Sequence, residues 1–597
     1  MEEQQLTADF INKKFFKNSF KLYHSSNCRE YWDGLDIRED FQKAAEKYKY
    51  YTPKVLLASS YLRFIRDGNR TEYEGEYFER RDALRIFTIL EAIENNGEYI
   101  DRIINIVWAI LEETTWVLPA HWSNVKNLDG LPDGVNDGID LFAAETSSLL
   151  AMVYEILGEK LDEVTKNISG RMLYEINRRI IDKYLDETVP KWWFGYNSNW
   201  NVWIHSNILA AAPVVCKDGD KLAQVISRAD RSITMYAECQ PEDGACEEGP
   251  MYWNYAGAAL IDCEWLLYKY SAGEYNRLYT DKLKEISRYF MKMYICGSRV
   301  ANYCDTPGIC IGDYGELYKL GKIYKDYELI SLAKQVFDNS NGELLAETKF
   351  KPYNLPIKIK ARNELKKMPS VAIAPKSYYL KSVEITTNHM QSGLFFSAIA
   401  GNNGVGHNHN DVGSFIIYKN SVPFIIDIGS ITYEKDTFTD KRYTIWNNMS
   451  EYHNLPKING KNQHEGKEYS ATDVAFGNNR FSFDMKNAYV NRDEIVRWRR
   501  SFDFSGKVII VEDNFELNEE SEIVFNFILT TMPEICGNEI ILKKGGQTMK
   551  MQFYTSLFEF ETEEINTPDV TASWNGSVYR LKAKLRKRKM KIKLIIE

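Results

Sequence analysis

The hydrophobic pattern of this chain changes its period near residues 345–375, and this change limits the fold more than any other feature. Between residues 41 and 341, apolar side chains recur at helical spacing and are broken by short turns. After the segment 351–357 they alternate in short runs separated by turn residues. We therefore predict a multidomain α+β protein. Its parts are an N-terminal (α/α) toroid of helical hairpins, residues 1–360, and a C-terminal antiparallel β-sandwich, residues 361–597.

The same two patterns predict the individual segments. Helices are expected at 82–94, 98–114, 139–157, 164–185, 204–212, 221–239, 251–271 and 280–294. Strands are expected at 376–383, 393–400, 414–419, 423–427, 507–513, 523–529 and 548–554. The final stretch, 579–596, alternates apolar residues with lysine and arginine. This alternation favours a last strand with one solvated face over a basic tail that binds an anionic polymer.

Charge and the ends of apolar runs limit the partners and the location. The formal net charge of −9 argues against nucleic acid as the main partner, because there is no overall basic field to hold phosphates. The first residues carry no positive start and no apolar run, and no later stretch looks apolar for long enough to span a bilayer. We therefore expect a cytoplasmic protein without a membrane partner. The sequence is compatible with a homodimer.

The nine cysteines are an odd number and show no C-x-x-C spacing. They are expected to be reduced thiols, mostly buried, which agrees with a cytosolic location. A zinc site built from cysteines is not expected.

Two of the eight histidines, His407 and His409, lie two residues apart in the segment 406–411. In an extended segment both would point to one side. A third histidine, His453, follows, and Asp427 ends a predicted buried strand. Two histidines and one carboxylate that leave an open coordination position are a common zinc arrangement. Histidines that are hydrogen-bonded in loops are the alternative.

The order His407-x-His409-x-Asp411, a strand, Asp427-x-Gly429 and then His453-Asn454 resembles the signature of heparinase II/III-like proteins. The resemblance implies that His409, Asp427 and His453 hold a zinc ion that is chiefly structural. It also implies that His407 faces the substrate. His464 is a weaker ligand candidate, because it lies in a polar turn.

Three segments of the helical half resemble further parts of the same family. Residues 112–121, with Trp116 and His121, resemble its tryptophan-and-histidine loop, and 199–203 resemble its asparagine-bearing helix start. Residues 243–255 resemble its tyrosine segment. Together the signatures imply a lyase that cleaves uronate-containing acidic oligosaccharides or polysaccharides, glycosaminoglycan-like or alginate-like, by β-elimination, with the helical domain catalytic.

Such an elimination removes the proton at C5, beside the uronate carboxylate, and expels the sugar linked at O4. The carboxylate charge has to be neutralised by donors aimed at the developing enediolate. Asn201 and Asn199 are the first candidates for this role, with the choice between them open, and His205 follows one helical turn later.

The reaction also needs a base for the C5 proton and an acid for the leaving oxygen. Tyrosine can serve as either if nearby positive charge lowers its pKa. We take Tyr255 as the leading candidate and Tyr252 as the second, while His407 would approach the sugar from the other face. Two tyrosines that simply pack in the core are the alternative.

The remaining candidates would bind the substrate. Aromatic rings at helix ends can stack on sugars, and an arginine can bind a carboxylate or sulfate. A buried aromatic core and an ordinary surface loop are the competing interpretations. The substrate-binding candidates are His121, Trp116, Trp200, Glu248, Arg442 and Tyr443.

Two other functions compete with the lyase. A glycoside hydrolase or phosphorylase would need two carboxylic acids, for which Glu248 with Asp243 or Glu112 could be proposed. A carbohydrate-binding protein without catalysis could keep the fold, since fold alone does not imply activity. The absence of an export signal favours imported oligosaccharides as the substrate.

Overall fold

The computed structural model describes residues 6, 8–15, 20–122, 130–135, 137–344, 351–371, 373–374, 376–553 and 557–597. The chain separates into two compact units. The helical unit contains Met1–Gln240, Asn254–Ser287 and Asp313–Val371. The β unit contains Pro241–Trp253, Arg288–Gly312 and Ala372–Glu597. The expected α+β class, with a helical N-terminal region and a C-terminal antiparallel sheet domain, is confirmed.

The division differs from a single cut at residue 360, because two earlier segments belong with the β unit. Side chains of that unit hold them: the Thr387 hydroxyl donates to the carbonyl of Lys292 at 2.6 Å, and the Ser382 hydroxyl donates to the Asp243 carboxylate at 2.7 Å. These contacts join residues far apart in the sequence, so hydrophobic period alone does not reveal them.

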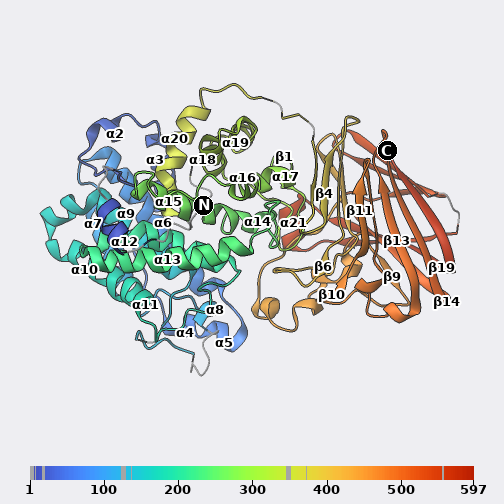
Figure 1. Ribbon diagram of the computed structural model, residues 1–597, viewed down its shortest axis with the longest axis horizontal. Helices are drawn as coiled ribbons and strands as arrows, with labels where there is room; N and C mark the ends of the chain where they lie inside the picture. Colours follow the sequence, from blue (N-terminus) through green and yellow to red (C-terminus); the bar gives the residue numbers. More distant parts are fainter. Residues whose placement is uncertain are drawn as a thin grey trace. The chain divides into compact units, whose positions relative to one another are not determined.

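The helical unit is built around a few long helices that are buried on most sides. Its helix α9 packs against α6, α10 and α12, and α12 also packs against α13 and α15 (Figure 1). Asp140, Ser198 and Asp218 accept hydrogen bonds from backbone N–H groups at the first turns of α9, α12 and α13. The helices are α1 (Ala8–Lys14), α2 (Arg29–Asp33), α3 (Arg38–Glu46), α4 (Ala58–Tyr61), α5 (Arg63–Asp67), α6 (Thr71–Glu94), α7 (Ile100–Leu111), α8 (Pro119–Trp122), α9 (Leu141–Val164), α10 (Lys166–Ile176), the π-helix Asn177–Ile181, α11 (Asp182–Leu185), α12 (Asn199–Val215), α13 (Gly219–Cys239), α15 (Gly257–Tyr270), α16 (Asp281–Ser287), α18 (Tyr314–Tyr324), α19 (Tyr327–Asn339), the 3-10 turn Pro352–Asn354 and α20 (Leu355–Leu365).

One of these helices, α9, is long and apolar enough to cross a membrane by length and composition, with a mean hydropathy of 1.3. However, 89% of that window is buried inside the protein. Burial of this extent is what the core helix of a helical domain requires, and length and composition alone are weak grounds for a membrane span.

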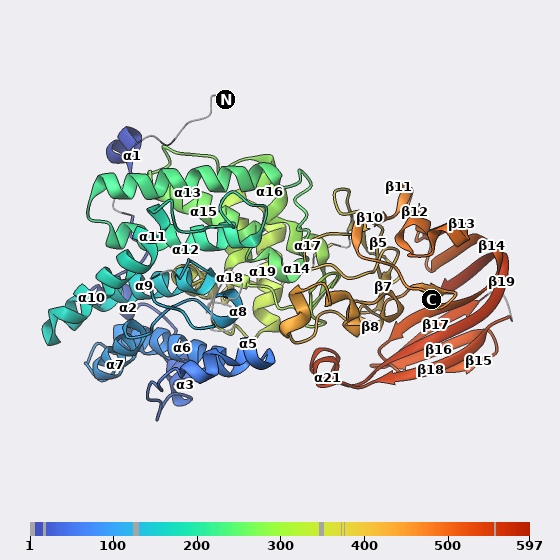
Figure 2. The ribbon, with the colours of Figure 1, turned by 90° about the horizontal axis from the view of Figure 1, so that it is seen from below.

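The β unit is built on a large antiparallel sheet in which the longest strands, β14 and β19, run side by side (Figures 1 and 2), while β1 with β2 and β6 with β10 form two separate two-stranded sheets. Its strands are β1 (Tyr294–Cys296), β2 (Arg299–Val300), β3 (Ser377–Leu380), β4 (Ile385–His389), β5 (Leu394–Ile399), β6 (Asn402–Asn403), β7 (Phe415–Lys419), β8 (Val422–Ile425), β9 (Pro456–Ile458), β10 (Gly466–Ser470), β11 (Thr472–Gly477), β12 (Arg480–Asp484), β13 (Ile495–Asp503), β14 (Ile509–Leu529), β15 (Glu534–Cys536), β16 (Glu539–Lys544), β17 (Gln547–Phe553), β18 (Glu559–Ile565) and β19 (Val578–Ile596). The unit also holds the helices α14 (Pro250–Trp253), α17 (Tyr289–Met293) and α21 (Pro568–Trp574).

Strand β14 replaces the two strands that were predicted at 507–513 and 523–529. A bulge between Glu516 and Ser521 shifts its register against β19, so the sequence pattern is interrupted while the strand continues. The first half pairs with β13 and the second with β9 and β8. Side chains from both halves enter one apolar core.

The predicted last strand is β19, and its basic side chains are solvated and paired with acidic ones. Lys589 and Lys591 lie 2.8 and 2.9 Å from Glu516 and Glu512 of the neighbouring strand. Exposed pairs of this kind contribute at most about 1 kcal/mol each. Arg586 and Arg588 of the same strand are exposed, so these two pairs do not neutralise all of its positive charge.

Two predicted helices are broken in the structure. The stretch 251–271 divides into α14 and α15 around the non-helical Ala256 (φ −109, ψ −88). The stretch 280–294 divides into α16 and α17 and ends at the start of β1. The other predicted helices lie on helices.

Arg500 ties the β13–β14 pair to two loops of the β unit. It is 2% exposed and donates to the Asp513 carboxylate at 3.0 and 2.9 Å and to the carbonyls of Gly413 and Asn454 at 2.9 Å. Removing one partner of a buried ion pair leaves the other charge uncompensated.

We therefore expect Arg500→Met to lower the free energy of unfolding by about 3–5 kcal/mol. The exposed Arg497 of the same strand is the control, and Arg497→Met should cost less than about 0.5 kcal/mol. Urea unfolding of both variants measures the difference. Equal, small losses in the two variants would show that the Arg500 network does not stabilise the unit.

Candidate functional site

The histidine segment 406–411 is a turn rather than an extended stretch, because His407 has a left-handed backbone (φ 56). This conformation is uncommon for a residue other than glycine. The spacing suggested that the two histidines lie close together, and in the structure both contact the same third residue. That residue is Asp305, which the sequence analysis did not identify.

Asp305 is 3% exposed and accepts hydrogen bonds from three side chains of the β unit. His407 Nδ1 lies 2.8 Å from Oδ2, while His409 Nε2 and Arg442 Nη2 lie 3.1 and 2.8 Å from Oδ1. Burial opposes ionisation, but the hydrogen bonds from the two histidines and the charge of Arg442 outweigh it. The pKa of Asp305 is therefore held well below its usual value.

The loop that carries Asp305 packs closely against two glycines, whose lack of a side chain leaves room for it. A Cβ at Gly429 (φ 81) would lie 2.4 Å from the carbonyl oxygen of Thr306, and one at Gly249 (φ 90) would lie 2.8 Å from that of Tyr303. Any larger residue would have to displace the loop. The glycines of the Asp427-x-Gly429 motif and of the tyrosine segment thus position Asp305.

Arg442 holds Asp305 rather than pointing at open space. Its guanidinium also donates to the carbonyl of Asn408 at 3.1 and 2.9 Å and to that of Thr437 at 3.2 Å. Arg442 is buried and holds Asp305 in this structure, and its binding of a substrate carboxylate or sulfate stays a prediction. Tyr443 beside it is half-buried.

Aromatic rings and two carboxylates, those of Asp305 and Glu248, surround His407, which is 17% exposed at its side chain. The ring of Tyr252 stacks on it at 4.0 Å between centroids, and Phe438 contacts it edge-on at 5.7 Å. The Glu248 carboxylate lies 3.4 Å from Nε2. Within the β unit the structure therefore brings together His407, Tyr252 and Glu248.

The hydroxyl of Tyr252 lies 2.6 Å from that of Tyr433. Burial and the negative charge of Asp305 raise the pKa of Tyr252. The predicted acid–base role relied on a lowered tyrosine pKa, so the shift at Tyr252 has the opposite sign. A phenol in this environment stays protonated at neutral pH.

His409, Asp427 and His453 form a group whose ligand atoms all lie within 4.8 Å of one another. All three are buried. His453 Nδ1 lies 2.7 Å from Asp427 Oδ2, and the Gly429 N–H donates to Asp427 Oδ1 at 2.9 Å. His409 Nδ1 and His453 Nε2 are buried and have no hydrogen-bond partner among the described residues. Two orphaned imidazole nitrogens beside a carboxylate fit a metal ion.

Asp411, the last residue of the histidine motif, lies beside this group. Burial raises the pKa of its carboxyl to about 7, although the positive charge of His453 opposes the shift. His464, the weaker ligand candidate, is half-exposed, and its Nδ1 contacts Glu465 rather than the three clustered residues.

In the helical unit, Asn201 and His205 are fully buried and use their polar atoms internally. The Asn201 amide donates to two backbone carbonyls at 3.2 and 3.3 Å and accepts from the Ser232 hydroxyl at 3.1 Å. His205 lies 2.6 Å from the Asn201 carbonyl and 2.9 Å from the Tyr184 hydroxyl. Both side chains are hydrogen-bonded within the helical unit, and their contact with a substrate carboxylate stays a prediction.

Helix α12 is buried on nearly all sides, and its first residue is Asn199. Spacing within such a helix does not tell which side chain faces a cleft. Asn199 is 4% exposed and stands at the first helical position, where the end of the helix is least covered by its own turns. The choice between Asn199 and Asn201 therefore stays open.

Aromatic rings form a continuous series in the helical unit, which we call the aromatic series. It runs from the exposed Trp192 to Trp200, then to His121, Phe142, Trp203 and Tyr255, with centroid distances of 4.9, 4.7, 5.6, 5.9 and 4.3 Å. His121 Nδ1 lies 2.7 Å from Asp140, which caps α9. The structure thus brings His121, Trp200 and Tyr255 into one series.

Trp116 lies outside this series and is a core residue. It is 1% exposed, donates from Nε1 to the carbonyl of Ile110 at 3.1 Å, and has the Arg179 guanidinium 5.0 Å above its ring. Trp116 packs in the core here, as the alternative interpretation expected, and its contact with a sugar stays a prediction.

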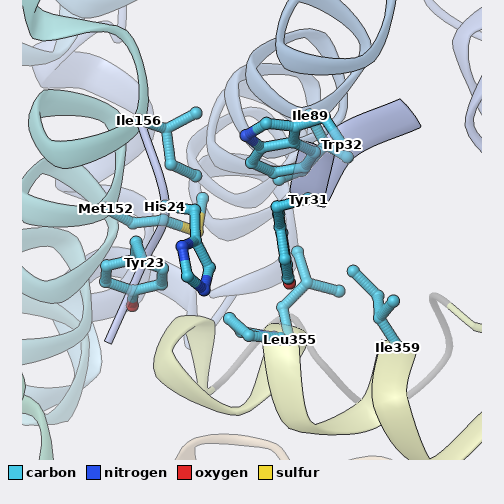
Figure 3. Close-up of a pocket in the computed structure, with 10 residues that line it drawn as sticks. Tyr23, His24, Tyr31, Trp32, Ile89, Met152, Ile156, Leu355 and Ile359 are labelled. Atoms are coloured by element: carbon cyan, nitrogen blue, oxygen red, sulfur yellow. The ribbon is translucent and has the colours of Figure 1, made fainter. Parts of the chain in front are cut away.

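A pocket of the helical unit contains none of the predicted residues (Figure 3). Its rings include Tyr23, Trp32 and the stacked pair of His24 and Tyr31, with centroids 4.1 Å apart. Apolar side chains such as Leu355 complete it. An acidic sugar needs charged or hydrogen-bonding partners, so this lining does not suit it.

Comparisons with known proteins agree with this architecture. Residues 384–596 match the family model described as heparinase II/III-like, C-terminal. A crystal structure of heparinase III is similar, with 12% identity, a TM-score of 0.64, and coverage of 98% of this chain and 93% of that chain. Heparan sulfate lyase HepC from Pedobacter heparinus is also similar, with 13% identity, a TM-score of 0.54, and coverage of 99% and 85%. No curated protein has a matching sequence.

The buried His205 makes the stability of the protein depend on pH. Burial lowers its pKa from 6.5 to about 4, so the folded protein holds it neutral where the unfolded chain protonates it. The stability that this neutral ring contributes is present above pH 6.5 and is lost as the pH falls towards 4. The loss amounts to as much as about 3 kcal/mol.

We expect His205→Gln to be less stable at neutral pH but to lose less free energy of unfolding between pH 6.5 and 4. Denaturant unfolding of both proteins across this range measures the two slopes. Parallel curves for the variant and the wild type would contradict the assignment.

Proposed function

Because residues 384–596 are a heparinase II/III-like C-terminal domain and the whole chain shares the heparinase III fold, we propose that this protein is a polysaccharide or oligosaccharide lyase. It would cleave uronate-containing acidic glycans, glycosaminoglycan-like or alginate-like, by β-elimination. The observation that carries the proposal is the environment of His407, which lies between a buried carboxylate and a stacked tyrosine.

His407 would be the base that removes the C5 proton. The Asp305 carboxylate accepts only, so the bond at Nδ1 places the ring proton there and leaves the lone pair of Nε2 for the substrate. The geometry repeats the carboxylate–imidazole pairing by which other enzymes orient a general base. Stacking on Tyr252 restricts the ring further.

Tyr252 would protonate the leaving O4 oxygen. Its raised pKa keeps the phenol protonated at neutral pH, which suits an acid rather than a base. The Tyr433 hydroxyl at 2.6 Å offers a hydrogen-bond partner through which the phenolic proton can be replaced. Tyr255 remains the tyrosine candidate of the helical unit, supported by the sequence pattern and by its place in the aromatic series.

Glu248 would accept hydrogen bonds from sugar hydroxyls. Its carboxylate lies 3.4 Å from His407 Nε2, where a uronate carboxylate would be repelled but a hydroxyl would be held. In the helical unit, Asn201 and Asn199 stay the predicted donors for the uronate carboxylate, with His121 as a further candidate. The exposed ring of Trp192, at one end of the aromatic series, would stack on a sugar.

The hydrolase alternative is less well supported. A hydrolase needs two carboxyl groups free to act on either side of the bond. The carboxylates that contact His407 are Glu248 and Asp305, and Asp305 is buried with three donors bound to it. The Asp305 carboxylate therefore already accepts hydrogen bonds from the protein's own side chains.

A zinc ion held by His409, Asp427 and His453 is part of the proposal, since the orphaned imidazole nitrogens fit it. When bound, it would fix the segments that carry its ligands and so support His407. The chain's own residues would perform the proton transfers.

The activity is tested by incubating the purified protein with heparan-type, chondroitin-type and alginate-type oligosaccharides and following the ultraviolet absorbance of unsaturated uronate. We expect one class to be cleaved. His407→Ala and Tyr252→Phe should each lower kcat by about 10²–10⁴-fold, because each removes a proton-transfer group. Tyr489→Phe, which removes a buried tyrosine hydroxyl bonded to Pro456, is the control and should keep the activity.

The lyase proposal fails if the cleaved substrate yields saturated ends only, or if the His407 and Tyr252 variants keep wild-type rates. Loss of activity in Tyr255→Phe but not in Tyr252→Phe would move the acid to the helical unit.

Metal analysis tests the zinc proposal separately. We expect stoichiometric zinc in protein purified without chelator, and its loss in His409→Ala and His453→Ala, because each removes a ligand. His464→Ala should keep the metal, since His464 is outside the three-residue group. A metal-free wild type would overturn the assignment.

A further inference from the structure

We propose that Asp305 is a positioning residue that fixes the proton positions of two histidines at once, those of His407 and His409. The inference rests on the proposed lyase function only for what His407 does to a substrate. What Asp305 does to the two rings follows from the hydrogen bonds of the β unit.

The first effect is on His407. Asp305 Oδ2 lies 2.8 Å from Nδ1, and a carboxylate held by an arginine has no proton to donate. In the neutral ring the proton therefore stays on Nδ1 and the lone pair on Nε2. The competing partner is Glu248, 3.4 Å from Nε2, which would favour the opposite tautomer. The shorter distance at Nδ1 decides for Asp305.

The second effect is on His409, where the order of the nitrogens is reversed. Asp305 Oδ1 lies 3.1 Å from Nε2, so the proton stays on Nε2 and Nδ1 is left bare. This bare Nδ1 is one of the orphaned buried nitrogens beside Asp427 and His453. A hydrogen bond to the far nitrogen orients a metal-ligating histidine and raises its basicity.

One carboxylate thus gives two neighbouring histidines opposite tautomers. Each carboxylate oxygen accepts from one histidine: Oδ2 from His407 and Oδ1 from His409. The direction of each ring follows from which oxygen it binds. Asp305 would therefore couple the geometry of the proposed base to that of the proposed metal site.

Asp305 can do this because its own position is determined from several sides. Arg442 binds Oδ1 at 2.8 Å and is anchored on the carbonyl of Asn408, between the two histidines. Two residues earlier, the Tyr303 hydroxyl lies 3.1 Å from that of Ser397 in β5. These contacts hold the Asp305 loop and the histidine segment 406–411 in a fixed position relative to each other.

Wild-type protein tests the tautomers directly. Histidine labelled with nitrogen-15 gives few ring signals, since the chain has eight histidines, and single substitutions assign them. Above the imidazole pKa we expect His407 protonated on Nδ1 and His409 protonated on Nε2. Either ring in the opposite tautomer would overturn the proposal.

Asp305→Asn tests the coupling. An asparagine keeps the shape but offers one acceptor oxygen instead of two, so at least one histidine loses its acceptor. We expect zinc affinity to fall by about 10–100-fold and kcat to fall by a similar factor with KM nearly unchanged. Unchanged zinc affinity and unchanged kcat in a folded variant would overturn the proposal.

Asp513→Asn is the matched control, because Asp513 is also a buried carboxylate bound by an arginine in the β unit, yet it contacts neither histidine. We expect this variant to lose stability but to keep zinc affinity and kcat. Equal losses of zinc in both variants would mean that Asp305 acts through stability alone, which contradicts a positioning role.

The readouts separate this inference from the proposed function. A wild type that forms no unsaturated uronate would end the lyase proposal, while the tautomers and the zinc titration would still decide on Asp305. If Asp305→Asn does not fold, the wild-type tautomers decide alone.

Discussion

A buried carboxylate has to be surrounded by donors, and in this protein the Asp305 carboxylate imposes that condition on the whole candidate site. Its three donors come from His407, His409 and Arg442, more than a hundred residues further along the chain. An unpaired charge in this position would cost several kcal/mol, about 3–5 when one partner of a buried pair is removed. When the β unit folds, the segments that carry these side chains therefore have to come together around Asp305.

The fold class could be predicted from the change of hydrophobic period, and most expected helices lie on helices. The predicted strands at 507–513 and 523–529 turned out to be one strand, β14, because a bulge interrupts the alternation without ending the hydrogen bonds. The membership of 241–253 and 288–312 in the β unit could not be predicted. It depends on contacts between residues far apart in the sequence.

The grouping of His409, Asp427 and His453 was the most predictable part of the site: the family resemblance named these residues, and the structure places their ligand atoms within 4.8 Å of one another. Asp305 gave no such signal: the segment around it reads as an ordinary turn, and its partners follow a hundred residues later. Asn201 was given a substrate role from the resemblance of residues 199–203 and His205 from helical spacing; both lie in α12, which is buried on nearly all sides. Arg442 was expected to meet an anion and does so, but the anion is Asp305.

We propose that cleavage is a β-elimination in which His407 is the base. The hydrogen bond from His407 to Asp305 would determine which ring nitrogen is left to accept the proton. The most direct measurement is the mass of the products formed in water enriched in heavy oxygen. Elimination adds no water across the broken bond, so we expect an unsaturated product without heavy oxygen. Products that each carry the full mass of a saturated sugar, with one heavy oxygen at the new end, would show hydrolysis and contradict the claim.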